Sequence, residues 1–193
     1  MNRSFRLGAV LLAITGLTGL VLGIAYKITE EPIARSQARQ KMEAMKRVLP
    51  LGDDFRKITA SGVPGGEDFS EIVEGYRGDS LVGYALTVRT GGYGGVITLM
   101  VGVGADGAVS GVQILGHQET PGLGARATEP AFLDQFRGRG GIPFKVVKPP
   151  SREDGIQAIT GATITTRGVA EGVEKVLDFV RKNFLRREGE SQE

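Results

Sequence analysis

The residues best suited to chemistry are hydroxyl side chains gathered in the stretch ITGATITTRG, residues 159–168. Gly161 loosens the backbone of this turn, and an amphipathic run follows directly. A helix start presents unpaired N–H groups and a partial positive charge of roughly half a unit, so phosphate bound or esterified nearby is favoured. In a simpler interpretation, Thr165 or Thr166 only caps the helix. The four hydroxyls belong to Thr160, Thr163, Thr165 and Thr166.

A second segment with chemical potential is GHQETPGLGAR, residues 116–126. Pro121–Gly122 has the composition of a tight turn, and Gly124 relieves the backbone after it. One interpretation is a polar clamp for a planar ligand, and the other is an ordinary connection between a strand and a helix. The clamp would be formed by Glu119, Thr120 and the backbone around Gly122 and Leu123.

Composition excludes several kinds of site. The chain has no cysteine, which excludes disulfides, thiolate zinc sites and cysteine-ligated iron–sulfur clusters. His117 is the single histidine, so the chain alone cannot build a two-histidine metal site, and we expect no metal and no catalytic histidine. GGYGG at residues 91–95 lacks the spacing of a dinucleotide fingerprint, and no phosphate-loop motif occurs. Redox chemistry therefore requires an organic cofactor or a partner.

The balance of basic and acidic residues indicates whether a nucleic acid is an expected partner. There are 24 basic and 22 acidic residues, a formal net charge of +2, with no long basic block. We therefore expect no nucleic-acid partner. A chain of 193 residues with 40% apolar residues can bury one ordinary core, which predicts one domain with an appendage.

That appendage is an N-terminal apolar segment. Leu7–Tyr26 contains no charged residue and is flanked by Arg3, Arg6 and Lys27. As a helix it would span roughly 30 Å, the thickness of a bilayer's hydrocarbon core. The apolar region of a cleaved signal peptide is shorter, about 7 to 15 residues, and Tyr26–Ile28 makes a poor cleavage site. The segment is predicted to be a retained single-pass anchor.

The positive charges near the anchor do not fix its orientation, because they lie on both sides of it. Long domains translocate largely regardless of such charges. We expect the bulk of the chain to lie outside the cytoplasm.

The elements that must position the two segments follow from sequence patterns. A stalk helix is expected from Thr29, as N-cap, to just before Pro50, and residues 51–70 are expected to be loop with one short strand. Four antiparallel strands follow, in residues 71–78, 81–90, 95–104 and 108–116, with Asp106–Gly107 predicted to form a type I′ hairpin turn.

The remaining elements are helical apart from one strand. Phe132 and Phe136 lie in a predicted short helix after Pro130, and residues 141–147 are expected to return as a strand. Apolar residues at three- and four-residue spacing predict an amphipathic helix over Thr166–Arg187 that packs on the sheet. The fold class is therefore α+β, an antiparallel sheet with packed helices behind one transmembrane helix.

Three motifs together resemble a known family. Thr160–Gly161–Ala162–Thr163, with Thr165 two residues on, resembles the [S/T]GAT flavinylation motif of the covalent FMN-binding domain family. Residues 117–124 are similar to its ETPGLG segment, and residues 92–95 to its GYGG segment. With the anchor and the length, the whole chain is similar to the G subunits of Rnf electron-transport complexes. The C subunits of sodium-pumping NADH:quinone reductases are the nearest competing family.

The resemblance implies roles for individual residues. A flavin transferase would join FMN through its phosphate to Thr163, with Thr165 as the fallback. Glu119, Thr120, Gly122 and Leu123 would line the isoalloxazine ring. The residues around the attachment point that would also bind the cofactor are Thr160, Gly161, Ala162, Thr165 and Thr166. Where the family carries an acidic residue three positions before the Ser/Thr, this chain has Gln157, and Asp154 lies three residues further upstream.

The resemblance also implies a function: a membrane-anchored flavoprotein subunit that relays electrons through covalent FMN in an ion-translocating oxidoreductase complex, without substrate turnover of its own. Its partners would be the other membrane and redox subunits of that complex. The implied organisation is an anchor in residues 1–28, a stalk helix in 29–50 and a periplasmic FMN-binding domain in 51–193 at the bacterial inner membrane.

Two alternatives come from other classes of protein. One is a regulatory or maturation protein with the same domain; such proteins usually carry further transmembrane helices or cysteine clusters, and this sequence shows neither. The other is a non-redox extracytoplasmic binding module whose threonine turn holds a phosphate-bearing ligand reversibly.

Overall fold

The structure, a computed structural model, describes residues 3–59, 62–150 and 154–185. The chain divides into two compact units, residues 1–42 and residues 43–193. The first unit is helical, and the second contains the sheet and the candidate site.

A single helix, α1 (Arg3–Val48), accounts for the N-terminal unit and continues into the second. Its apolar part has a mean hydropathy of 2.3 and is long enough to cross a membrane, by length and composition. The predicted end before Pro50 is confirmed, but the predicted start at Thr29 is wrong. The Thr29 hydroxyl donates back to the Ala25 carbonyl at 2.8 Å, a bond that threonine makes inside helices.

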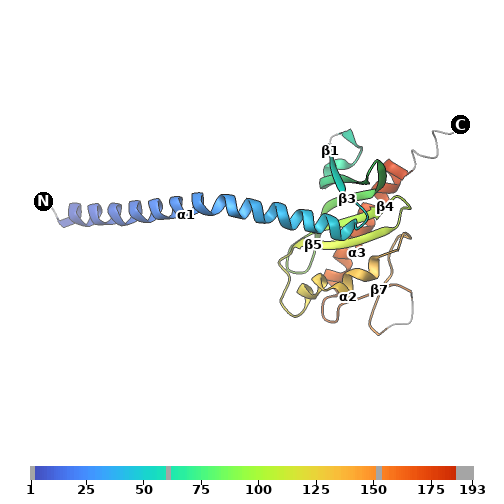
Figure 1. Ribbon diagram of the computed structural model, residues 1–193. Helices are drawn as coiled ribbons and strands as arrows, with labels where there is room; N and C mark the ends of the chain where they lie inside the picture. The colour runs from blue at the N-terminus through green and yellow to red at the C-terminus, as the bar shows by residue number, and fades with distance from the viewer. Residues whose placement is uncertain (1–2, 60–61, 151–153, 186–193) are drawn as a thin grey trace. The chain divides into compact units, whose positions relative to one another are not determined.

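The second unit is built on a five-stranded antiparallel sheet in which each strand pairs with the next along the chain (Figure 1). This arrangement confirms the four predicted strands and the short strand before them. A short 3-10 helix, η2 (Gly66–Asp68), precedes the second strand. The strands are β1 (Asp54–Ile58), β2 (Phe69–Arg77), β3 (Ser80–Gly91), β4 (Val96–Gly104) and β5 (Val109–Gly116).

The turn between β4 and β5 differs from the prediction. A type I′ turn needs positive φ at both central residues, whereas here Gly107 has a φ of 77° and Asp106 does not have a positive φ. The Gly107 N–H donates to Gly104 O, and the Gly104 N–H donates to Ala108 O, both at 2.9 Å. The connection is thus a three-residue loop that ends in a glycine with left-handed backbone conformation. Asp106 therefore does not have to adopt a positive φ.

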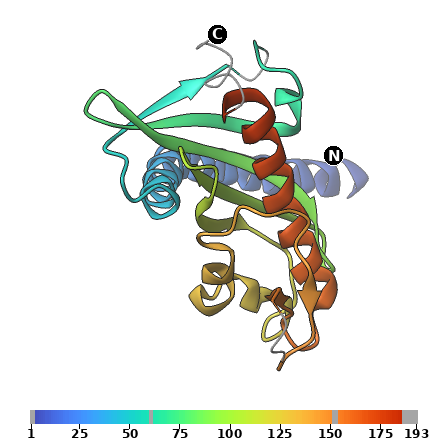
Figure 2. The same ribbon diagram turned by 90° about the vertical axis from the view of Figure 1, so that its right-hand side faces the viewer.

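One face of the sheet is covered by α3 (Thr163–Val180) and the π-helical turn η5 (Arg181–Leu185) that continues it (Figure 2). The helix packs on β3 and β4, as predicted, but begins three residues earlier than expected; Arg186 and Arg187 lie outside the described residues. Helix and sheet share one core, whose fully buried members include Leu86, Val88, Leu99, Val101, Val173, Val176 and Leu177.

The opposite face of the sheet receives the last turn of α1. Alternate residues of a strand point to opposite faces, so Met100 and Ala85 pack here against Val48, away from α3. A Cβ on Gly102 would lie 2.1 Å from the Val48 carbonyl oxygen, so the glycine is required for this close approach. The Ser110 hydroxyl donates to the same carbonyl and caps the helix end.

Short elements lie between β5 and α3. The predicted helix around Phe132 and Phe136 is confirmed, but the predicted strand in residues 141–147 is reduced to two residues. Pro143 and Pro149 close to it cannot donate ladder hydrogen bonds. The elements are η3 (Gly124–Thr128), α2 (Pro130–Leu133), η4 (Asp134–Phe136) and the parallel pair β6 (Val146–Val147) and β7 (Ile156–Gln157).

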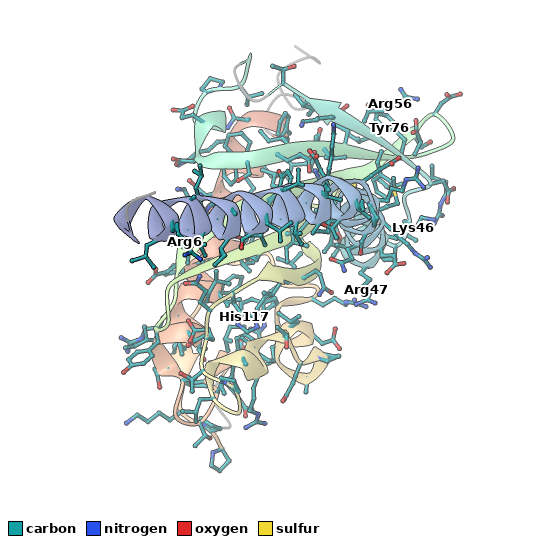
Figure 3. The ribbon with its side chains drawn as sticks, turned by 90° about the vertical axis from the view of Figure 1, so that its left-hand side faces the viewer. Arg6, Lys46, Arg47, Arg56, Tyr76 and His117 are labelled. Atoms are coloured by element: carbon teal, nitrogen blue, oxygen red, sulfur yellow. The ribbon has the colours of Figure 1, made fainter. Side chains whose placement is uncertain are left out.

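The edge strand β1 and its neighbour β2 carry a charged cluster (Figure 3). The Arg56 guanidinium lies 4.5 Å from the Tyr76 ring centroid and donates to Asp54 at 2.9 Å, and this ion pair raises the pKa of Arg56. The Tyr76 hydroxyl donates to Glu74 at 3.0 Å, which raises the pKa of Tyr76. Charges on an edge strand discourage pairing with another chain.

Candidate functional site

A cavity of about 460 Å³ lies where three segments of the second unit meet. The segments are the β3–β4 loop, the loop that follows β5, and the first turn of α3 with the residues before it. These are the positions of the three motifs in the sequence. The lining residues are Tyr93, Glu119, Thr120, Leu123, Gly124, Gly161, Ala162, Thr163, Ile164 and Thr165.

The loop after β5 is shaped by the predicted tight turn. The Leu123 N–H donates to Thr120 O at 3.2 Å, and Gly122 has a φ of 77°. A positive φ at the third residue is the signature of a type II turn with proline at the second, so the Pro121–Gly122 prediction is confirmed. The turn directs Glu119, Thr120 and Leu123 to the cavity.

The threonine segment begins α3 in a different way from the capping interpretation. Ala162 is the N-cap without a side-chain cap bond, and Thr163 is the first helical residue. Thr166 lies inside the first turn, where its hydroxyl donates to Ala162 O at 3.0 Å and accepts the Ile159 N–H at 3.1 Å. Thr165 is also inside that turn, so neither threonine is the N-cap. Gly161, with a φ of 80°, makes the sharp entry that places Ala162 there.

Glu119 links all three segments. Its carboxylate is buried, and one oxygen accepts a hydrogen bond from the Thr165 hydroxyl at 2.7 Å. The other accepts the Gly94 backbone N–H at 2.9 Å. The Glu119 N–H donates to Nδ1 of His117 at 3.1 Å, which gives that partly buried histidine a structural contact.

The structure brings most of the predicted residues together, though not all. Thr160 faces a separate pocket of about 230 Å³ that Gln157 also lines, and Thr166 is fully buried. Gly122 supports its turn without lining the cavity. The predicted residues that line the cavity are Glu119, Thr120, Leu123, Gly161, Ala162, Thr163 and Thr165.

Sequence reasoning did not assign Tyr93, Gly124 and Ile164 to the site, yet all three line it. Tyr93 belongs to the GYGG segment and Gly124 to the ETPGLG segment, which could have signalled them. Ile164 is 56% exposed, and its position between two threonines of the helix start was the available signal. Within the described ranges, no group of three or more acidic, histidine or cysteine residues is arranged to hold a metal ion.

Comparison with known proteins assigns the chain to a family. Residues 92–178, which contain every lining residue, match the FMN-binding domain. The chain is 36% identical to the G subunit of the Na⁺-translocating ferredoxin:NAD⁺ oxidoreductase complex of Acetobacterium woodii, over 88% of this chain and 87% of that one. The chain belongs to the family of G subunits of ion-translocating oxidoreductase complexes.

Two further comparisons bear on the family and on the fold, respectively. The G subunit of the proton-translocating ferredoxin:NAD⁺ oxidoreductase complex of Clostridium ljungdahlii is 32% identical over 85% of this chain and 84% of its own. The C subunit of the Na⁺-translocating NADH-quinone reductase of Parabacteroides distasonis has the same fold, with a TM-score of 0.57, 20% identity, and coverage of 76% of this chain and 91% of that one. The predicted family and the predicted α+β fold are both confirmed.

Proposed function

We propose that this chain carries FMN as a phosphoester of Thr163 and relays electrons within an ion-translocating oxidoreductase complex. The observation that supports it best is the position of Thr163, which is the first residue of α3 and lies in the cavity wall. A helix start favours a phosphate, through the N–H groups of its first turn and the positive end of its dipole.

The surroundings of the threonines favour Thr163 over the fallback Thr165. Thr165 is fully buried, and its hydroxyl is engaged by Glu119. Esterifying Thr165 would break that bond and leave the carboxylate oxygen without its donor. Thr163 is only partly buried and lines the cavity, so it is better placed than Thr165 for modification.

The cavity suits a flavin mononucleotide in size and lining. Its volume of about 460 Å³ lies within the usual range of small-molecule sites, and its rim carries Tyr93, Leu123 and Ile164 for apolar contact. When bound, FMN supplies one- and two-electron transfer chemistry. Glu119, Thr120, Leu123, Gly161 and Ala162 would surround it.

Attachment requires an enzyme and an activated donor. The Oγ–P bond that forms at Thr163 replaces the hydroxyl proton, so an equivalent bond at phosphorus has to break. A flavin transferase acting on a flavin dinucleotide would meet this need, with the phosphoanhydride breaking and a nucleoside monophosphate leaving. Gln157, near this segment and exposed, does not alter the cavity, because it lies outside its wall.

The relay also requires access for the other proteins of the complex. The rim side chains are exposed, 74% for Tyr93, 45% for Leu123 and 56% for Ile164, so the cavity is open to neighbours. We propose that α1 anchors the chain in the cell membrane and that the second unit lies outside the cytoplasm. The two similar G subunits bear names with different translocated ions, Na⁺ and H⁺, so either ion is compatible with the proposal.

The test is Thr163→Ala in the full-length protein, produced together with a flavin transferase. We expect in-gel flavin fluorescence under denaturing conditions in the unaltered chain and none in the variant. Thr128→Ala removes an exposed threonine hydroxyl outside the cavity and is expected to keep the fluorescence. Fluorescence that survives Thr163→Ala would place the attachment elsewhere. Flavin that washes away from the denatured unaltered protein would favour a reversible binding module.

A further inference from the structure

Glu119 is a buried carboxylate in the cavity wall, only 6% exposed. Each of its oxygens accepts one hydrogen bond from the protein, from Thr165 and from Gly94. An ionised carboxylate only accepts, so these two donors match its charged form. None of the ion pairs formed among residues 3–59, 62–150 and 154–185 includes Glu119.

Glycines make the space that this carboxylate occupies. A Cβ on Gly92 would lie 2.2 Å from one Glu119 oxygen, and a Cβ on Gly124 would lie 2.2 Å from the other. A Cβ on Gly94 would lie 2.2 Å from the carbonyl oxygen of Gln118, the residue before Glu119. No larger residue could stand at these positions without moving the carboxylate or its backbone. The three glycines and Thr165 therefore form a socket for Glu119.

The socket joins segments that are distant in sequence. Gly94 lies 25 residues before Glu119, and Thr165 lies 46 residues after it. Because Thr165 is two residues beyond Thr163, the bond to Glu119 also fixes the helix turn that presents the attachment hydroxyl. We infer that Glu119 is a positioning residue that holds the three cavity walls together and keeps a negative charge in them, making the bound flavin harder to reduce.

The inference has two parts. The electrostatic part, in which Glu119 makes the flavin harder to reduce, rests on the proposed function. The positioning part, in which Glu119 holds the three walls together, does not. A hydrogen bond to an ionised group is stronger than one between neutral groups, so losing it loosens the walls whether or not flavin is attached. A fixed negative charge with no cationic partner opposes the arrival of an electron nearby, more strongly in a poorly solvated site than in water. Glu119 therefore lowers the midpoint potential of the flavin.

The positioning part is tested on full-length protein in detergent, in a Thr163→Ala background that lacks the proposed flavin. Thr165→Val and Glu119→Ala should each lower the thermal midpoint by roughly 5 to 10 °C, and the double variant by no more than the larger single shift. Thr165→Ser, which keeps the hydroxyl, should restore the midpoint. Additive shifts, or a midpoint unchanged by Thr165→Val, would overturn the inference.

The electrostatic part is tested with Glu119→Gln in the flavin-bearing protein. The amide can still accept from Gly94 and can donate to Thr165, so shape is kept while charge is removed. We expect covalent flavin to be retained and its midpoint potential to move to a more positive value. Thr128→Ala removes an exposed threonine hydroxyl outside the cavity and should leave the potential unchanged. An unchanged potential in Glu119→Gln would overturn this part.

The two failures are distinguishable. If the unaltered protein holds no covalent flavin, the proposed function fails. The thermal-unfolding experiment, which needs no flavin, still tests the coupling between Glu119 and Thr165.

Discussion

At the scale of single residues, the site depends on glycine where the chain turns sharply. Gly161 has a φ of 80°, and a Cβ there would lie 3.0 Å from the Leu123 side chain. For a residue with a Cβ, this left-handed backbone conformation carries a steric cost that destabilises the protein. The entry into α3 and the place of Thr163 therefore both depend on this glycine.

Gly161→Ala should lower the free energy of unfolding by about 1 to 2 kcal/mol, since alanine pays a steric cost at positive φ. Urea denaturation of the full-length protein followed by circular dichroism measures it. Gly116→Ala is the matched control, because a Cβ there meets nothing within 4 Å and no positive φ is required. Equal stability of the Gly161→Ala variant and the unaltered protein would contradict the role given to Gly161.

The sequence reveals part of this residue-level arrangement. Clustered hydroxyls and the Pro121–Gly122 pair are local signals, so they predict the threonine segment and a tight turn, and the structure shows that this turn is of type II. The bond from Thr165 to Glu119 joins positions 46 residues apart, and no local pattern encodes such a partner. For the same reason Thr165 was interpreted as a cap or a fallback attachment point, when its hydroxyl is a donor in the socket.

At the scale of elements, the site is held in place by the close packing of α3 on β3. A Cβ on Gly168 would lie 2.0 Å from the Gly91 carbonyl oxygen, and the Thr90 hydroxyl donates to Gly168 O at 2.9 Å. The clash is with backbone, which cannot rotate aside as a side chain can. Helix and strand therefore approach each other just before the β3–β4 loop that carries Tyr93.

Gly168→Ala should therefore destabilise the protein by about 1 to 3 kcal/mol, the usual cost of overpacking, although alanine is the better helix former. It should also reduce the yield of covalent flavin, because the helix start moves with the helix. Urea denaturation and in-gel fluorescence measure the two effects. Glu171→Ala, at an exposed position of the same helix, should stay within about 0.5 kcal/mol of the unaltered protein. A stabilised Gly168→Ala variant would refute the packing argument.

Local sequence patterns predict most elements. Apolar residues at helical spacing predict α3, and short runs of β-branched and aromatic residues between turn signals predict the four long strands. The continuity of α1 through Thr29 was not, because a threonine followed by acidic residues and a proline is equally typical of a helix start. The hairpin at Asp106–Gly107 was placed correctly, but its turn type depends on one residue of loop length that composition does not fix.

At the scale of the whole molecule, the chain joins an apolar helix to a sheet domain that holds the cavity. Within residues 1–42, the apolar side chains that the structure describes are exposed. Such an apolar surface is more stable in lipid than in water. The family and the long apolar segment were both indicated by the sequence, since motifs and apolar length are visible there. The side of the membrane was not, because positive charges lie on both sides of the apolar stretch.

The proposed orientation can be tested by labelling, because the natural chain has no cysteine. A single cysteine in place of Asp79, in the exposed turn between β2 and β3, should react with a membrane-impermeant maleimide in intact cells. A cysteine in place of Ser4, before the apolar stretch, should react only after the cells are permeabilised. The reverse pattern would show that the domain lies in the cytoplasm.

A phosphoester of FMN on Thr163 can be detected by tandem mass spectrometry of peptides from the purified, denatured full-length protein. We expect one FMN phosphoryl group on Thr163, with Thr160, Thr165 and Thr166 unmodified. A flavin-bearing protein in which Thr163 is unmodified and the mass increment lies on Thr165 or any other residue would contradict it.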